Sequence, residues 1–176
     1  RRQRQMCIRD SYNGSSWINM TLDGNWQGVD NVGEYVSLQL DSGNWPHIAY
    51  YNATAGDLMY MYNDGSAWYK STAYSTNNVG AHASLSLDSN DNAHIAHYNM
   101  QFQNLMYTNF GGGNWTTEPV DSVGRVGEYC AIAIDANDSP HIAYVDRDNG
   151  GAIKYAHKNQ SWDFIEIDEE GEFISI

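Results

Sequence analysis

A repeat of 47 residues is the feature that most constrains how this chain can fold. Three sets of residues recur at this interval: His47, His94 and His141; Trp68, Trp115 and Trp162; and Asp41, Asp88 and Asp135. Periods of about 20–50 residues indicate architectures in which each repeat is one supersecondary unit. The chain therefore contains three diverged copies of one unit, each too small to bury a core without its neighbours.

Each unit holds four short runs that alternate as β-strands do. In the first unit Val36 and Leu38 alternate with polar neighbours, and the further runs span 47–51 and 58–62 and start at Trp68. Period-2 alternation bounded by Gly, Asn, Asp and Pro indicates strands, and no segment has a helical period. Four short antiparallel strands per repeat are typical of a β-propeller blade. We predict an all-β fold, a β-propeller fragment of about three four-stranded antiparallel blades with partial blades on both sides.

The repeated motif resembles that of known propellers. The pattern SL-x-LD-x4-HIAYYN, followed by L-x-Y and G-x-x-W, is similar to repeats of secreted bacterial and archaeal β-propellers of the sialidase-like and lectin-like kind. The resemblance covers nearly everything after residue 16 and implies the fold more specifically than the function. The sialidase Asp-box, S-x-D-x-G-x-x-W, is not cleanly present.

The repeat also predicts where the domain begins and how it divides. Residues 1–11 contain RQMCIRDS, which resembles a translated sequencing adapter, so we expect this segment to be an artefact or disordered. The rest, 12–176, is a partial propeller with blades at approximately 33–79, 80–126 and 127–170. Closed propellers have about four to eight blades, so we expect the remaining blades of a longer parent chain as a partner.

Charge and composition narrow the other partners. Lys and Arg number 9 against 22 Asp and Glu, a formal net charge of −13. Phosphate backbones require clustered basic side chains, so we expect no nucleic acid. The apolar runs are too short for membrane insertion. A glycan or an extracellular protein is the expected ligand, and the expected location is extracellular or at the cell surface.

The repeated polar and aromatic residues have structural explanations beside functional ones. The three histidines are metal ligands, bases or structural hydrogen-bonding residues, and we favour the last. The three aspartates cap turns, and the turns DSNDN and DANDS resemble calcium loops without the EF-hand spacing. The three tryptophans stack on sugars or pack between blades, and we favour packing. We predict no metal site and no cofactor, with calcium left open.

Residues that break the repeat are better candidates for a site, because the fold does not require them. His82 stands where the other units have Tyr35 and Tyr129, and His97 where they have Tyr50 and Tyr144. Inter-blade links and second-to-third strand loops emerge on one face of a propeller, which should collect an acidic and aromatic rim. The predicted ligand-binding residues are Glu34, Tyr35, His82, Arg125, Glu128, Tyr129, Asp146 and Arg147, with Glu172 and Phe173 on the same rim.

Three functions are compatible with this pattern. We favour a non-catalytic extracellular recognition module, with carbohydrate as its ligand, because aromatic rings and carboxylates suit sugars. An alternative is part of a propeller-fold glycoside hydrolase, sialidase-like, or a lyase. A glycosidase needs two carboxylates flanking the bond, and no catalytic residue is assigned here. A further alternative is a scaffold for adhesion or protein contact.

Overall fold

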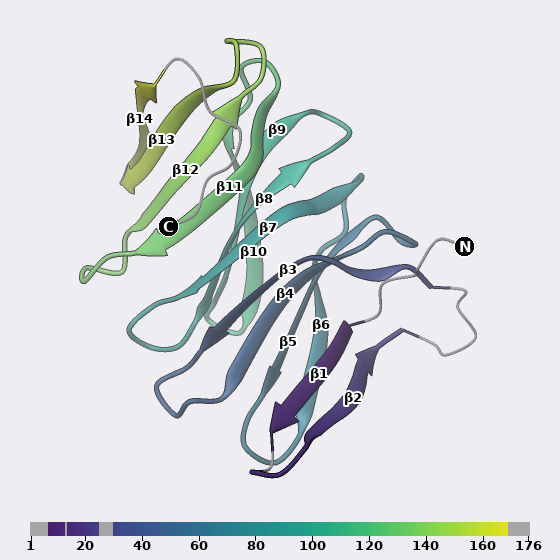
Figure 1. The fold of residues 1–176 in the computed structure, drawn as a ribbon. Helices are drawn as coiled ribbons and strands as arrows, with labels where there is room; N and C mark the ends of the chain where they lie inside the picture. The colour runs from purple at the N-terminus through teal and green to yellow at the C-terminus, as the bar shows by residue number, and fades with distance from the viewer. Residues whose placement is uncertain (1–6, 13, 25–29, 169–176) are drawn as a thin grey trace.

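The computed structural model describes residues 7–12, 14–24 and 30–168, and all their regular structure is β-strand. Three four-stranded antiparallel sheets follow one another as blades 1, 2 and 3 (Figure 1). Blade 1 contains β3 Val32–Leu40, β4 Pro46–Asn52, β5 Asp57–Asn63 and β6 Trp68–Tyr74. Blade 2 contains β7 Val79–Leu87, β8 Ala93–Asn99, β9 Asn104–Gly111 and β10 Asn114–Asp121. Blade 3 contains β11 Val126–Ile134, β12 Pro140–Asp146, β13 Ala152–Asn159 and β14 Ser161–Asp168.

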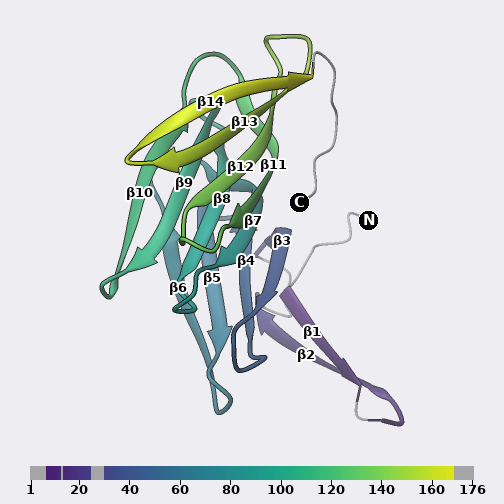
Figure 2. The ribbon, with the colours of Figure 1, turned by 90° about the vertical axis from the view of Figure 1, so that its left-hand side faces the viewer.

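The order of strands within each sheet follows the order in the chain. Consecutive strands are hydrogen-bonded neighbours in all three blades. The first strands β3, β7 and β11 lie side by side, and the sheets spread apart towards the fourth strands (Figure 2). This arrangement confirms the predicted all-β propeller fold with four-stranded antiparallel blades. None of the described residues forms a helix, so none of them provides a helix able to cross a membrane.

A two-stranded sheet precedes blade 1. Its strands are β1 Cys7–Tyr12 and β2 Trp17–Asp23, paired antiparallel. The strand β2 lies where the repeat predicts a partial blade before the first complete one. Part of the segment expected to be artefactual or disordered, residues 7–11, forms β1 here, and its origin in an adapter stays a prediction.

The first strand of every blade begins with a bulge. The register shifts twice between Val32 and Ser37, and equivalent shifts occur in β7 and β11. Glycine at the bulge has a steric cause: a Cβ on Gly127 would lie 2.7 Å from the Cα of Leu105 in the preceding blade, and one on Gly80 would lie 2.8 Å from that of Leu58. The bulge therefore brings each first strand into backbone contact with the previous blade.

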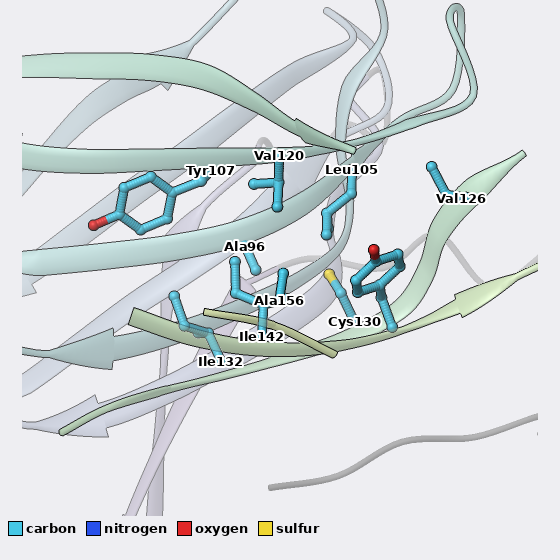
Figure 3. Close-up of a cluster of buried hydrophobic side chains, with 10 residues drawn as sticks. Ala96, Leu105, Tyr107, Val120, Val126, Cys130, Ile132, Ile142 and Ala156 are labelled. Carbon is cyan, nitrogen blue, oxygen red and sulfur yellow. The ribbon is translucent and has the colours of Figure 1, made fainter. Parts of the chain in front are cut away.

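The hydrophobic core lies between blades. Leu105 and Val120 of blade 2 point towards Ile132, Ile142 and Cys130 of blade 3 (Figure 3). Cys130 is a free thiol, and its burial raises its pKa to about 12, so it behaves as a small apolar residue. An equivalent cluster joins blades 1 and 2 around Leu58, Leu85 and Ile95. Each blade is thus stabilised by its neighbour, as the short repeat requires.

Serine hydroxyls connect the blades at their first strands and hairpins. The hydroxyl of Ser37 accepts the backbone N–H of Leu85 at 3.0 Å, and Ser84 accepts that of Ile132 at 3.2 Å. In the hairpins Ser42 donates to Asp91, and Ser89 to Asp138. Both inter-blade interfaces therefore share one hydrogen-bonding scheme.

Candidate functional site

The repeated histidines form one array per blade, in which the histidine is buried in blades 1 and 2 and half-buried in blade 3. His47 Nδ1 is hydrogen-bonded to the Tyr60 hydroxyl at 2.5 Å, and its Nε2 lies 3.4 Å from Asp41 Oδ2. The same Asp–His–Tyr arrangement recurs in the other blades, in Asp88, His94 and Tyr107 and in Asp135, His141 and Tyr155. Burial raises the pKa of Tyr60, which disfavours a reactive phenolate. The prediction of structural hydrogen-bonding histidines is confirmed.

The repeated aspartates cap hairpins. Asp41 Oδ1 accepts the backbone N–H groups of Gly43 and Trp45, both at 2.8 Å. These backbone bonds are the main reason that the pKa of Asp41 is below its usual value. Asp88 and Asp135 accept equivalent bonds. The predicted Asx turns are confirmed, and no group of three potential metal-ligating side chains occurs within the described ranges.

The sequence-predicted site residues come together in part. We call Tyr35, His82 and Tyr129 the aromatic row; each stands at φ +53° in the bulge of its first strand. The ring centroid of His82 lies 4.5 Å from that of Tyr35 and 4.5 Å from that of Tyr129. Burial lowers the pKa of His82, with Glu128 opposing and Arg147 reinforcing that shift. The row joins all three blades, and its imidazole is neutral at pH 7.

Charged groups surround one end of the aromatic row. Arg147 donates from Nε to Glu128 Oε2 at 2.9 Å, and its guanidinium lies 5.3 Å from the Tyr129 ring centroid. Arg125 approaches the same carboxylate, with 4.0 Å between its Nε and Glu128 Oε1. Two guanidinium groups therefore share one carboxylate beside the row.

The other predicted site residues have different surroundings. Glu34 accepts the amide N–H of Asn31 at 2.7 Å at the opposite end of the row. Asp146 is buried, accepts the N–H of Asp148 and lies 3.7 Å from Lys154 Nζ, so it serves the loop between β12 and β13. Glu172 and Phe173 lie outside the described residues.

A pocket of about 510 Å³ lies elsewhere, between blades 1 and 2. We call it the inter-blade pocket. Five aromatic residues line it, Tyr60, Tyr62, Tyr69, Phe110 and Trp115, together with polar residues that include Lys70, Ser71, Asp91 and Asn92. Its hairpin residues belong to the end of the sheets opposite the links, so it is separate from the aromatic row.

The rings of the inter-blade pocket have a defined geometry. Tyr62 and Tyr69 are stacked, with centroids 5.1 Å apart and an interplanar angle of 21°. Trp115 meets Tyr60 and Phe110 edge-on, at centroid distances of 5.0 and 5.2 Å. Tyr69 is 46% exposed. The exposed Tyr69, stacked on the half-buried Tyr62 beside a tryptophan edge, offers a flat apolar platform to a ligand.

The polar groups of the pocket are held in place. Trp115 Nε1 donates to Ser71 at 3.3 Å, Lys70 Nζ donates to Asp23 at 2.7 Å, and Asp91 accepts from Ser42. A few fixed polar groups on a largely aromatic wall are the usual composition of a small-molecule site.

The equivalent interface between blades 2 and 3 carries different side chains. Thr116 pairs with Asn109 there as Tyr69 pairs with Tyr62 in blade 1. Glu118 is bonded to both Lys158 and Trp162, so an ion pair occupies the region beside this tryptophan. The stacked aromatic pair thus belongs to the first interface and not to its counterpart.

Sequence reasoning missed the inter-blade pocket. It expected the tryptophans to pack between blades, which Trp115 against Tyr60 and Trp162 against Tyr107 confirm. It named repeat-breaking residues in the first and second strands, the links and the second-to-third strand loops, and none in the third and fourth strands. The same search in the third and fourth strands would have found Tyr62 and Tyr69, since Asn109 and Thr116 replace them one repeat later.

Comparison with known proteins identifies the fold. No protein-family model and no curated protein matches the chain. A fucose lectin from Kordia zhangzhouensis, solved with methyl-fucoside, matches with a TM-score of 0.52 and 17% identity, over 76% of this chain and 99% of that one. AofleA from Arthrobotrys oligospora matches with a TM-score of 0.58 and 10% identity over 91% of this chain, and a triple arginine-to-alanine mutant of it with 0.57 and 11% over 90%.

These similarities concern the architecture. The chain has an all-β, β-propeller fold of the kind found in lectins. It spans about half the length of AofleA, since 49% of that chain is covered. Function has to be argued from the site.

Proposed function

We propose that this chain is a carbohydrate-binding module and that a sugar binds in the inter-blade pocket. The stacked pair Tyr62 and Tyr69 beside Trp115 carries the proposal. The apolar face of a pyranose packs on such rings, while its hydroxyls reach fixed polar groups. The lectin architecture of the structural neighbours supports this assignment.

The role proposed is recognition without catalysis, in an extracellular or cell-surface protein. Lys70 and Asp91 give the pocket one charge of each sign, and Lys70 is already paired with Asp23. Such a balance favours a neutral sugar, because an anionic or a cationic ligand would each meet one charge of its own sign. The resemblance of the repeats to those of secreted propellers supports the location.

A glycan array tests the proposal. Labelled protein is applied to neutral glycans, with and without a calcium chelator, and hits are titrated by calorimetry against wild type, Tyr69→Thr and Tyr69→Phe. Thr is the residue of the next blade at this position, so Tyr69→Thr should fold. We expect Tyr69→Thr to weaken binding about tenfold, the size of one lost aromatic contact, and Tyr69→Phe to retain it. Absence of any glycan binding would refute the proposed function.

A further inference from the structure

Beside the aromatic row lies a cation, Arg125, whose side chain makes a long ionic contact and, among the described residues, no hydrogen bond. Five basic side chains lie in residues 14–24 and 30–168. Four of them donate a hydrogen bond to a carboxylate: Lys70 to Asp23, Lys154 to Asp121, Lys158 to Glu118 and Arg147 to Glu128. Among these residues only the Arg125 side chain donates none.

The guanidinium of Arg125 is accessible. Its side chain is 43% exposed, and its closest ionic contact, 4.0 Å from Nε to Glu128, exceeds hydrogen-bonding distance. Asp148 accepts the backbone N–H of Arg125 at 3.0 Å, which fixes the backbone rather than the side chain. A guanidinium has five N–H donors in a planar fork. These donors are therefore available to a ligand.

The fold does not require an arginine at this position. The equivalent residues in the other repeats are Asn31 and Asn78. Arg147 likewise stands where the other repeats have Ala53 and Met100, whereas Glu128 has the counterpart Glu34 in the first repeat. Arg125 and Arg147, which both depart from the repeat, thus lie near one end of the aromatic row, and the four cations other than Arg125 in residues 14–24 and 30–168 are hydrogen-bonded to acids.

We propose that Arg125 and the aromatic row form a second ligand site, and that its ligand is a sugar residue bearing a carboxylate. The planar fork of a guanidinium matches a carboxylate in a bidentate geometry. The aromatic row, whose Tyr129 end adjoins the Glu128 carboxylate that Arg125 approaches, provides ring faces for the pyranose that carries it. Glu128 and its partner Arg147 hold the Tyr129 end of the site.

This site is independent of the proposed function in its residues. It lies at the link end of the sheets, whereas the inter-blade pocket lies among hairpins at the other end. The pocket takes a neutral sugar by stacking, and the Arg125 site takes an acidic one by charge-assisted hydrogen bonds. Each can fail without the other.

Calorimetry with a trimer of galacturonic acid tests the second site. The control ligand is the same trimer after reduction of its carboxyl groups, which makes it neutral. We expect the acidic trimer to bind wild type at least about tenfold tighter than the neutral one, the size of a hydrogen bond to a charged group. Because the contact is partly exposed, its affinity should fall as salt is raised.

Two variants assign the binding to its residues. Arg125→Asn places the residue of the other two repeats at this position, so it should keep the wild-type melting temperature, and it should weaken binding of the acidic trimer about tenfold. Tyr69→Thr, in the inter-blade pocket, should leave that binding unchanged.

Three results would overturn the inference: no preference for the acidic trimer, no effect of Arg125→Asn in the folded variant, or loss of acidic-trimer binding in Tyr69→Thr. The last result would move the acidic ligand to the inter-blade pocket. Binding of neutral glycans in the array would in every case be judged separately.

Discussion

The two inter-blade interfaces share one backbone arrangement but carry different side chains near their tryptophans. At both, a tryptophan indole donates to the fourth strand of the preceding blade: Trp115 to Ser71 at the first and Trp162 to Glu118 at the second. The first interface surrounds its tryptophan with aromatic rings and an open pocket. At the second, the Lys158 ammonium lies 5.7 Å from the Trp162 ring centroid and is bonded to Glu118.

The difference between the two interfaces shows which parts of a repeat are constrained. Inter-blade hydrogen bonds and the bulge glycine recur because each blade depends on them for its contact with the next, and the Asp–His–Tyr array recurs because it connects strands and hairpin within each blade. Side chains near the outer hairpins vary freely. A ligand site can therefore be present at one interface and absent from its neighbour without a change in the fold.

The largest effects should follow from the shared framework. Gly127→Ala and Gly80→Ala should each lower the free energy of unfolding by about 3 kcal/mol. Both place a side chain at a positive φ and force its Cβ against the backbone of the preceding blade. Urea denaturation measures the loss. Gly112→Ala, where a Cβ meets nothing within 4 Å, is the control and should cost about 1 kcal/mol.

Similar losses at both interfaces would support one common framework. If Gly127→Ala cost no more than Gly112→Ala, the close approach of the first strand to Leu105 would not constrain the fold.

Acid should destabilise the two interfaces to different extents. Burial lowers the pKa of His97, at the first interface, to about 3. Between pH 6.5 and 3 the unfolded chain therefore binds a proton that the folded chain does not, and stability falls with pH by about 1.4 kcal/mol per unit. Wild type should thus lose about 2 kcal/mol more than His97→Gln between pH 6.5 and 5, measured by urea denaturation at both pH values.

The second interface should resist the same change. There the Tyr144 hydroxyl donates to Asp121, at the position equivalent to His97. Burial alone would raise the pKa of Asp121, but hydrogen bonds led by that from Lys154 outweigh it and lower the pKa. A carboxyl group whose pKa is lowered by folding contributes stability that is fully present above about pH 3.8. This contribution is lost only as the pH falls below that value. If wild type and His97→Gln lost the same stability on acidification, the first interface would not be the more acid-sensitive of the two.

Smaller effects should follow from the serine bridges. Ser37→Ala at the first interface and Ser84→Ala at the second each leave a backbone N–H without its acceptor. We expect each to lower the free energy of unfolding by about 1 kcal/mol. The third repeat has Ala131 at this position, so both variants should fold. A loss at only one of the two would show that the interfaces do not share this bond.

The smallest effect should come from the ion pair of the second interface. Glu118→Gln removes the charge opposite Lys158 but keeps an oxygen for the Trp162 indole. The pair is partly exposed, with side-chain exposures of 40% and 31%. The expected change in stability is therefore within about 0.5 kcal/mol. Neutral glycan binding should be unchanged in calorimetry; a change would place that ligand at the second interface.

The blades were predictable because their period is regular. Strands that recur every 47 residues can be recognised in the sequence, and residues such as Asp41 and His47 recur because they form the same hairpin and core contacts in each blade. The partners of the histidines were harder to predict, because Tyr155 stands one residue beyond the interval that relates Tyr60 to Tyr107.

The candidate sites were only partly predictable. His82 and Arg125 were visible as departures from the repeat, since nothing in the fold demands them. The approach of Arg125 to Glu128 depends on how the bulge and the neighbouring link turn, which no periodicity encodes. The pairing of Tyr62 with Tyr69 depends on strand register, and the pocket on a space between two sheets.

The changes at His97 illustrate a coupled departure from the repeat. Asp23 accepts a hydrogen bond from the hydroxyl of Tyr50, and Asp121 accepts one from that of Tyr144. At the first interface between complete blades, Tyr74 replaces that aspartate, and its ring lies 6.1 Å from His97. Either change was visible in the sequence, but their contact required the structure.

The decisive test of sugar binding in the inter-blade pocket is calorimetric titration of a neutral glycan from the array into wild type and Tyr69→Thr. If the sugar binds in the inter-blade pocket, one neutral sugar should bind per chain, and its affinity should be about tenfold lower in the variant. Equal affinity in the two proteins would contradict it, as would two sugars per chain, since the second interface would then bind despite its ion pair.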